Sequence, residues 1–153
     1  MLNENDLMRR CLKLGRLALA DGDAPVGSLI VRNREVVAFA GEAVKFKKDP
    51  TAHAEIEAIR RACEKLKTLE LIDCTLYTNV EPCWMCAYAI RQTRIERVVF
   101  GSQNTRTGGF SSQMPILLDE NLKLPLPQIE NGLLRDECDL LLIEFQKQKD
   151  AKK

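Results

Sequence analysis

Residues 73–86 read Asp73-Cys74-Thr75-Leu76-Tyr77-Thr78-Asn79-Val80-Glu81-Pro82-Cys83-Trp84-Met85-Cys86, and they combine a strand pattern with a helix start. Its first part, residues 73–80, is rich in the β-branched and aromatic residues that are typical of strands. Pro82 fits the start of a helix, because its fixed φ angle is already helical and its missing N–H has no partner there to lose. A helix over residues 82–92 carries Cys83 and Cys86 on one face, since residues three apart are neighbours on a helix. The stretch therefore predicts a strand that runs directly into a helix bearing two thiols.

The only histidine of the chain, His53, begins a second helical run at residues 53–66. Histidine and cysteine are the ligands that Zn²⁺ prefers, and catalytic zinc sites use three protein ligands where structural sites use four. His53, Cys83 and Cys86 therefore predict one catalytic Zn²⁺ with a position left open for water. Glu55 lies two residues after His53 and is then free to carry protons.

Each part of this pattern has another interpretation. A Cys-x-x-Cys pair alone is also typical of thioredoxin-like redox motifs, although these have no use for a distant histidine. Glu55 alone would be an ordinary first-turn acid that complements the helix dipole. A non-catalytic zinc module, with Cys74 or another thiol as fourth ligand, is a further hypothesis, but it leaves Glu55 without a role.

Elsewhere in the chain, predicted strands alternate with predicted helices. Helical spacing marks residues 7–18, apolar β-rich runs mark residues 26–31, 35–40 and 97–101, and an amphipathic helix is expected over residues 132–148. Thr51 is the candidate N-cap of the 53–66 helix. The alternation predicts an α/β fold, a three-layer αβα sandwich, with its ligands beyond the carboxyl ends of the strands. Residues 1–153 are expected to form a single domain.

Composition narrows the class of protein. Lys and Arg together number 23 against 22 for Asp and Glu, a net charge of +1, whereas dedicated nucleic-acid binders usually carry a basic excess. The chain contains no apolar run long enough to span a membrane, and residues 1–10 do not resemble a secretory signal. The remaining cysteines fall in apolar stretches, so we expect buried free thiols and a cytoplasmic location. These are Cys11, Cys63, Cys74 and Cys138.

Three stretches resemble the cytidine deaminase-like superfamily, and the resemblance spans about residues 5–148. They are Asp23-Ala24-Pro25-Val26-Gly27, Asp49-Pro50-Thr51-Ala52-His53-Ala54-Glu55-Ile56 and Leu76-Tyr77-Thr78-Asn79-Val80-Glu81-Pro82-Cys83-Trp84-Met85-Cys86-Ala87. They are most similar to the branch that holds tRNA adenosine, guanine and cytosine deaminases. The resemblance implies a central mixed sheet of about five strands, one Zn²⁺ per subunit, a homodimer, and hydrolysis of a C–N bond of a cyclic amidine with release of ammonia.

The resemblance also implies roles for single residues. Glu55 is implied as the proton carrier between water, the ring nitrogen and the departing amine, and the Ala54 N–H as a donor to the substrate. Asn79 and Trp84 flank the cysteine motif, and Trp84 could form an aromatic wall against a planar ring. Phe110 lies in the Gly/Ser-rich loop of residues 102–113, and long loops often act as lids. Ordinary packing is the competing interpretation for all three.

Glu42 stands where this branch commonly carries an asparagine. An ionised carboxylate only accepts hydrogen bonds, whereas adenine flanks its amine with acceptor nitrogens and guanine-like or cytosine-like rings offer N–H donors. With the neutral charge, Glu42 favours deamination of a free nucleobase or nucleoside, a small-molecule aminated heterocycle. The alternative, a tRNA-specific adenosine-to-inosine deaminase with tRNA as its partner, is favoured by the similarity of residues 95–101, 107–109 and 132–138 and by the basic Arg106. Glu42 could also simply point to solvent.

Overall fold

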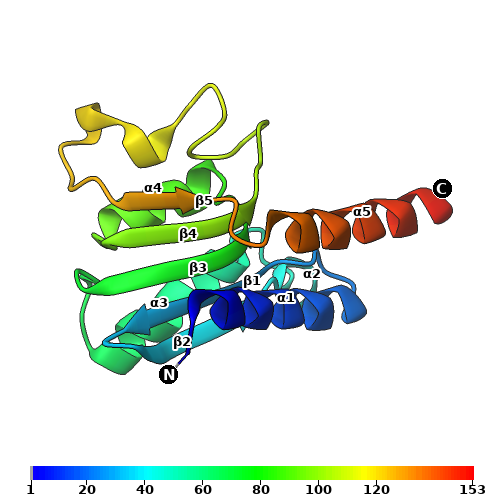
Figure 1. Ribbon diagram of the computed structural model, residues 1–153, viewed down its shortest axis with the longest axis horizontal. Coiled ribbons are helices and arrows are strands. Elements are labelled where there is room, and N and C mark those ends of the chain that lie inside the picture. Colours follow the sequence, from blue (N-terminus) through cyan, green and yellow to red (C-terminus); the bar gives the residue numbers. More distant parts are fainter. Residues whose placement is uncertain (1) are drawn as a thin grey trace.

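A computed structural model describes residues 2–153 of the chain, and Met1 lies outside the described residues. Helices and strands alternate along most of the sequence (Figure 1). Their bounds are α1 (Glu4–Ala20), β1 (Gly27–Arg32), β2 (Glu35–Gly41), α2 (Val44–Lys47), α3 (Ala54–Leu66), β3 (Cys74–Val80), α4 (Trp84–Gln92), β4 (Arg97–Ser102), η1 (Ile116–Leu118), η2 (Glu120–Leu122), β5 (Gln128–Asn131) and α5 (Arg135–Ala151).

One five-stranded mixed sheet, in the order β2-β1-β3-β4-β5, forms the middle layer. β1 is antiparallel to β2 and β3, whereas β3, β4 and β5 run parallel. Helices α1 and α5 lie on one face and α3 and α4 on the other (Figure 1). The predicted three-layer αβα sandwich with a mixed sheet of about five strands is confirmed.

Alternating side chains of the central strands supply a core on each face of the sheet, because successive residues of a strand point to opposite faces. Leu76 of β3 packs in a cluster with Ala58 of α3 and Ile90 of α4. Its neighbour Tyr77 packs in a second cluster with residues of α1 and α5, among them Cys11. Both faces of β3 are therefore buried, and the strand is held between two helix layers.

Several short elements were not predicted. β5 contains one apolar residue among four, so it has no alternating pattern and forms only because its backbone pairs with β4. α2 has four residues, too few for a helical period. The prediction that Thr51 caps the next helix is wrong, since His53 is the N-cap of α3 and the Thr51 hydroxyl donates to Asp49. Pro82 lies two positions before the first residue of α4, Trp84, and directly precedes the N-cap Cys83.

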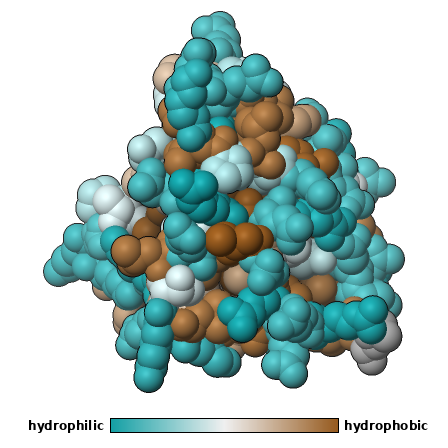
Figure 2. Space-filling view, turned by 90° about the vertical axis from the view of Figure 1, so that its left-hand side faces the viewer, coloured by the Kyte–Doolittle hydropathy of each residue, from teal (hydrophilic) through white to brown (hydrophobic). Residues whose placement is uncertain are grey.

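The end of the sheet opposite the carboxyl end of β3 has exposed apolar residues. Figure 2 shows the end at which β3, β4 and β5 begin, where apolar atoms lie among polar ones. In the α3–β3 connection Leu69 and Ile72 are exposed.

None of the described helices is both long and apolar enough to cross a membrane. All six cysteines are free thiols, and Cys63 is partly exposed rather than buried as predicted.

Candidate active site

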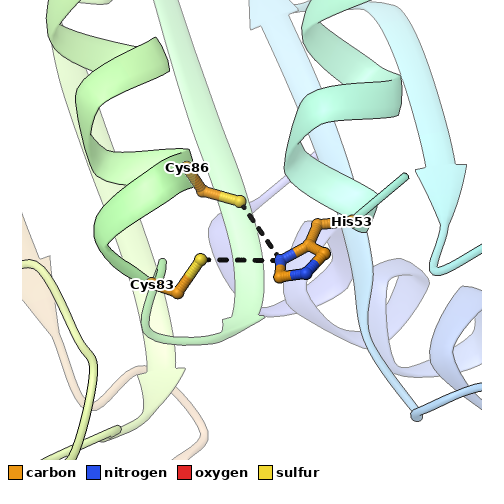
Figure 3. Close-up of side chains that lie close together, drawn as sticks. All are labelled: His53, Cys83 and Cys86. Atoms are coloured by element: carbon orange, nitrogen blue, oxygen red, sulfur yellow. Dashed lines mark hydrogen bonds between the residues drawn. The ribbon is translucent and has the colours of Figure 1, made fainter. Parts of the chain in front are cut away.

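The N-termini of α3 and α4 meet beyond the carboxyl end of β3. His53 is the N-cap residue of α3, Cys83 is the N-cap residue of α4, and Cys86 lies in the first turn of α4. β3 ends at Val80, so Glu81 and Pro82 alone connect the strand to the first thiol. Figure 3 shows the imidazole of His53 turned toward both sulfur atoms. The strand-to-helix stretch that defines the fold therefore also places the thiols opposite the histidine.

The geometry of these three residues fits a zinc ion. His53 Nδ1 lies 3.5 Å from Cys83 Sγ and 3.6 Å from Cys86 Sγ, and the ligand atoms all lie within 4.8 Å of one another. In a tetrahedral site, Zn–S bonds of about 2.3 Å and Zn–N bonds of about 2.0–2.1 Å place the sulfur and nitrogen atoms about 3.6 Å apart. The side chains are thus positioned to bind one metal ion with the predicted donor set.

A fourth protein ligand is not part of this cluster. Within residues 2–153, the cluster of His, Cys, Asp or Glu residues with ligand atoms close enough for a metal consists of His53, Cys83 and Cys86. Cys74 stands at the first position of β3, at the far end of the strand from Cys83. The arrangement does not support a closed structural zinc module with Cys74 as fourth ligand.

The cluster favours negative charge on the sulfur of Cys83 and disfavours it on that of Cys86. The hydrogen bond with Cys86 lowers the pKa of Cys83 to about 4, and the contact with His53 adds to this effect. The same bond with Cys83, together with burial, raises the pKa of Cys86. The hydrogen bond with Cys83 also raises the pKa of His53 to about 9. Cys83 is thus a thiolate at neutral pH, which is the form in which cysteine binds a metal ion.

Glu55, in the first turn of α3, has a buried carboxyl group. Burial, followed by the negative charges of Glu42 and Cys83, raises the pKa of Glu55 to about 8. Glu55 and His53 line a cleft of about 190 Å³. Its other lining residues are Val26, Glu42, Val80, Glu81, Cys83, Asn104 and Thr107. A carboxyl group with a pKa near neutrality is suited to both take up and release a proton.

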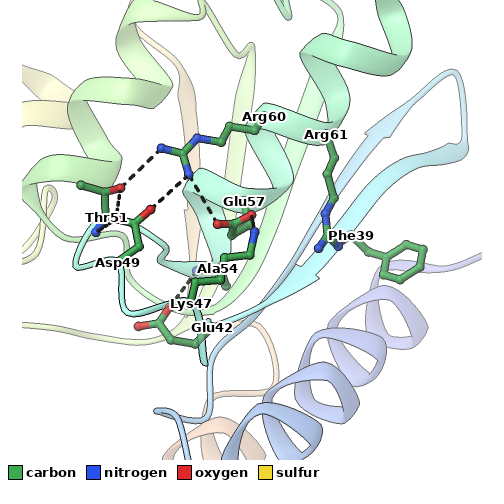
Figure 4. A network of polar contacts seen from close by, with 9 residues as sticks. All are labelled: Phe39, Glu42, Lys47, Asp49, Thr51, Ala54, Glu57, Arg60 and Arg61. Atoms are coloured by element: carbon green, nitrogen blue, oxygen red, sulfur yellow. Dashed lines mark hydrogen bonds and ion pairs between the residues drawn. The ribbon is translucent and has the colours of Figure 1, made fainter. Parts of the chain in front are cut away.

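Glu42 caps helix α3 from outside the helix. Its Oε1 atom accepts a hydrogen bond from the Ala54 N–H at 2.7 Å (Figure 4). The N-cap residue His53 makes no capping bond of its own. Burial raises the pKa of Glu42. The structure thus places Glu42 in the cleft wall, and the Ala54 N–H that was expected to face a substrate is paired with it.

Ion pairs link α2 and the α2–α3 connection, which follow Glu42 in the chain, to helix α3. Lys47 Nζ lies 2.8 Å from Glu57 Oε2, and Arg60 lies 3.4 Å from the other oxygen of the same carboxylate (Figure 4). Arg60 also approaches Asp49 at 4.0 Å. These contacts hold the α2–α3 connection against α3 and so support the position of His53.

The other predicted substrate contacts lie outside the cleft lining. The Asn79 amide accepts from the Gly27 N–H and donates to the Pro25 carbonyl, both at 2.8 Å. The Trp84 indole donates to Ser112 Oγ at 2.9 Å. The ring of Phe110 packs edge-on against Phe100, with ring centres 5.8 Å apart. Each of these side chains has a partner within the protein, and none of the three is among the residues that line the cleft.

Five cleft residues were missed by the sequence reasoning. Val80 and Glu81 could have been found by following the strand to its end, because they directly precede Pro82 and Cys83. Asn104 and Thr107 come from the loop after β4, and the Trp84 N–H donates to the Thr107 carbonyl at 2.9 Å. That contact depends on how the loop packs against α4, so the sequence pattern does not predict that Asn104 and Thr107 line the cleft. The fifth residue, Val26, precedes β1.

Comparisons with known proteins agree with this geometry. Residues 1–102 match the family described as the cytidine and deoxycytidylate deaminase zinc-binding region. The tRNA-specific adenosine deaminase of Haemophilus influenzae is 36% identical over 152 residues, which cover 98% of this chain and 87% of that protein. The enzyme of the same name from Aquifex aeolicus is 41% identical over 115 residues, covering 75% of this chain and 76% of that protein.

Solved structures show the same fold. One, from a study of A-to-I editing by tRNA:A34 deaminases at the wobble position of transfer RNA, has a TM-score of 0.85 and 34% identity and covers 89% of this chain and 98% of its own. Guanine deaminase from Bacillus subtilis has a TM-score of 0.66 and 37% identity, with 68% and 67% coverage.

Proposed function

The chain belongs to the cytidine and deoxycytidylate deaminase zinc-binding family, and from that premise we propose that it is a tRNA-specific adenosine deaminase. It is a zinc-dependent hydrolase that acts on a C–N bond, as predicted from the sequence. The prediction of a free nucleobase or nucleoside as substrate is wrong. Relatives that are 34–41% identical over most of the chain are tRNA-specific adenosine deaminases.

The wrong prediction rested on the net charge and on Glu42, and neither of them determines the substrate. Net charge averages over the whole surface, so a value of +1 does not describe the surface around the cleft. Glu42 was assumed to point its carboxylate at the substrate ring. One of its oxygens instead accepts from the Ala54 N–H, so the presence of a glutamate does not require a ring with N–H donors.

The proposed reaction converts an adenosine of tRNA to inosine. Water adds to the ring carbon that bears the exocyclic amine, the C–N bond breaks, and ammonia leaves. His53, Cys83 and Cys86 would hold the zinc ion. When bound, zinc supplies the Lewis acidity that makes water nucleophilic at neutral pH.

Glu55 transfers the protons in this reaction. It takes the proton of the attacking water, passes it to the ring nitrogen and then helps to protonate the departing amine. Its burial and raised pKa support this role, because a buried carboxyl group of neutral pKa takes up and releases a proton readily. The position of the Glu55 carboxyl in the cleft, next to a three-ligand metal cluster, carries the deaminase chemistry, and the relatives named tRNA-specific adenosine deaminases support tRNA as the substrate.

The test is deamination of an anticodon stem-loop RNA that contains a single wobble adenosine. We expect inosine and ammonia from this RNA and none from free guanine, cytosine or adenosine. Replacing Glu55→Gln should retain the zinc and reduce the rate by about 10²–10⁴-fold, because the proton carrier is lost. Glu64→Gln, an exposed residue of the same helix, is the matched control and should leave the rate unchanged. Ammonia from a free nucleobase alone would contradict the proposal.

The homodimer and the cytoplasmic location stay predictions. Light scattering of the zinc-loaded protein measures its mass, and a monomer at micromolar concentration would count against the dimer.

A further inference from the structure

We propose that Glu81 is a positioning residue, which fixes one wall of the cleft by holding the loop of residues 103–112 against the junction of β3 and α4. The loop supplies two cleft residues, Asn104 and Thr107. Glu81 itself directly precedes Pro82 and Cys83, so it connects the loop to the metal-binding motif. The inference rests on the proposed function only for the choice of substrate in its kinetic test.

The carboxylate of Glu81 is buried, with 1% of the residue exposed, and it accepts four hydrogen bonds from the loop. Its Oε1 atom accepts from the Asn104 N–H at 3.2 Å and from the Ser111 hydroxyl at 2.6 Å. Its Oε2 atom accepts from the N–H groups of Phe110 at 3.0 Å and of Ser111 at 2.9 Å. One side chain thus holds both ends of the loop.

These four bonds use the whole accepting capacity of the carboxylate. An ionised carboxyl group offers about four acceptor sites, two on each oxygen, whereas a protonated one would aim a hydrogen at one of the four donors. Among the described residues, Glu81 takes part in no ion pair with Lys or Arg, and the donors to its two oxygens all come from the loop.

The loop sequence is adapted to this contact. A Cβ atom on Gly108 would lie 1.8 Å from Glu81 Oε2, and one on Gly109 would lie 2.4 Å from Ala87 Cβ. Glycine at both positions therefore lets the loop backbone approach Glu81 and α4 closely. Gly108 also forms a β-bridge with Cys83, and the Gly109 N–H donates to the Pro82 carbonyl at 2.8 Å.

The loop keeps its own shape through a further contact. The Asn104 side chain donates to Thr107 Oγ1 at 3.0 Å and accepts from the Thr107 N–H at 3.2 Å. Asn104 and Thr107 therefore move together, and Glu81 sets where both lie relative to Cys83. Without this carboxylate the wall should shift, while the metal ligands, which lie at the N-termini of two helices, should stay in place.

The test compares Glu81→Gln with wild type in two measurements on the zinc-loaded protein. The substituted amide would turn an N–H₂ group toward the N–H donors of the loop, which keeps the size of the side chain but breaks at least one bond. Hydrogen exchange should lose protection in residues 103–112 and stay unchanged in α3. With the anticodon stem-loop RNA, KM should rise on the order of tenfold or more while kcat changes much less, because binding is affected and not proton transfer. Zinc content should remain at one per chain.

Glu35→Gln, an exposed glutamate at the start of β2, is the matched control and should match wild type in every measurement. Should Glu81→Gln fail to fold, Ser111→Ala removes a single donor and should give the same loss of protection at smaller amplitude. Unchanged exchange in residues 103–112, or loss of zinc and kcat with KM unchanged, would overturn the inference. If wild type does not act on RNA, the proposed function fails, and the exchange measurement still decides the role of Glu81.

Discussion

Three glutamates at the cleft differ in what their carboxyl groups contact. Glu55 is buried and its pKa is raised to about 8, so it suits proton transfer. Glu42 accepts from the Ala54 N–H and caps a helix. Glu81 accepts four hydrogen bonds from one loop. Glutamate thus has three different roles at this cleft, because the surroundings of each carboxyl group differ.

Asn79 provides a test of this argument. Its amide pairs with the N–H of Gly27 and the carbonyl of Pro25, so Asn79→Ala leaves two groups of the protein without their partner. We expect a loss in the free energy of unfolding of about 1–3 kcal/mol for each group left unpaired. Urea denaturation measures it, with the exposed Asn121→Ala as control. A raised KM with unchanged stability would instead make Asn79 a substrate contact.

Among the elements, helix α4 does more than present two thiols at its N-terminus, because it also holds the β4–β5 connection in place. Its residue Arg91 is 1% exposed, and its guanidinium donates to four backbone carbonyls of the β4–β5 connection. The acceptors are Pro125, Ile116, Asp119 and Leu124, at 3.1, 2.7, 2.9 and 2.9 Å. The same connection is held by Glu81 nearer to the cleft. A long segment with little regular structure is therefore ordered by two buried charges, one at each end of its path.

Replacing Arg91→Lys should weaken this anchoring. Lysine keeps the positive charge but lacks the planar fork that reaches several carbonyls at once. We expect a loss on the order of 2–4 kcal/mol in the free energy of unfolding and faster proteolytic cleavage within residues 113–127. Limited proteolysis followed by mass spectrometry measures the second effect. Arg94→Lys, an ion-paired and more exposed arginine just after α4, is the control. Cleavage equal to wild type would show that the connection does not depend on the guanidinium.

Over the whole molecule, 23 basic residues balance 22 acidic ones, and this sum does not describe the charges next to the cleft. Arg106 is exposed and lies between the cleft residues Asn104 and Thr107 in sequence. A cation at this position is suited to contact a phosphate of a bound RNA. The net charge of +1 conceals such a local feature, because acidic groups elsewhere cancel it in the sum.

Salt dependence tests this assignment. We expect Arg106→Gln to weaken binding of the anticodon stem-loop and to reduce the slope of log K against log salt by about 0.7–0.9, the change for one lost phosphate contact. The affinity would be measured between about 50 mM and about 200 mM salt. Arg34→Gln removes the same charge from the β1–β2 turn, which lies at the other end of the sheet, and should leave the slope unchanged. Equal slopes for wild type and Arg106→Gln would remove this residue from the RNA contact.

Much of the fold and the metal cluster could be predicted from the sequence, because the signals involved are local. Cys83 and Cys86 lie within one helical turn, and so do His53 and Glu55, so that the geometry of a helix sets each pair. The alternation of strand and helix patterns likewise predicts the layers of the sandwich. β5 was missed because its pairing with β4 supplies the stabilisation that its own four residues do not signal.

The amino-acid sequence alone was enough to predict the αβα architecture and the three residues positioned to bind a metal ion, and it predicted Glu55 as the acid without its burial. Only the tertiary structure decided what surrounds them. Glu42 meets the Ala54 N–H, and Asn104 meets Glu81, through contacts between segments far apart in the chain. Such contacts depend on how the layers pack and leave no periodic pattern in the sequence. The physical reason is that a side chain's role follows from its partners, and a residue distant in the chain becomes a partner only on folding.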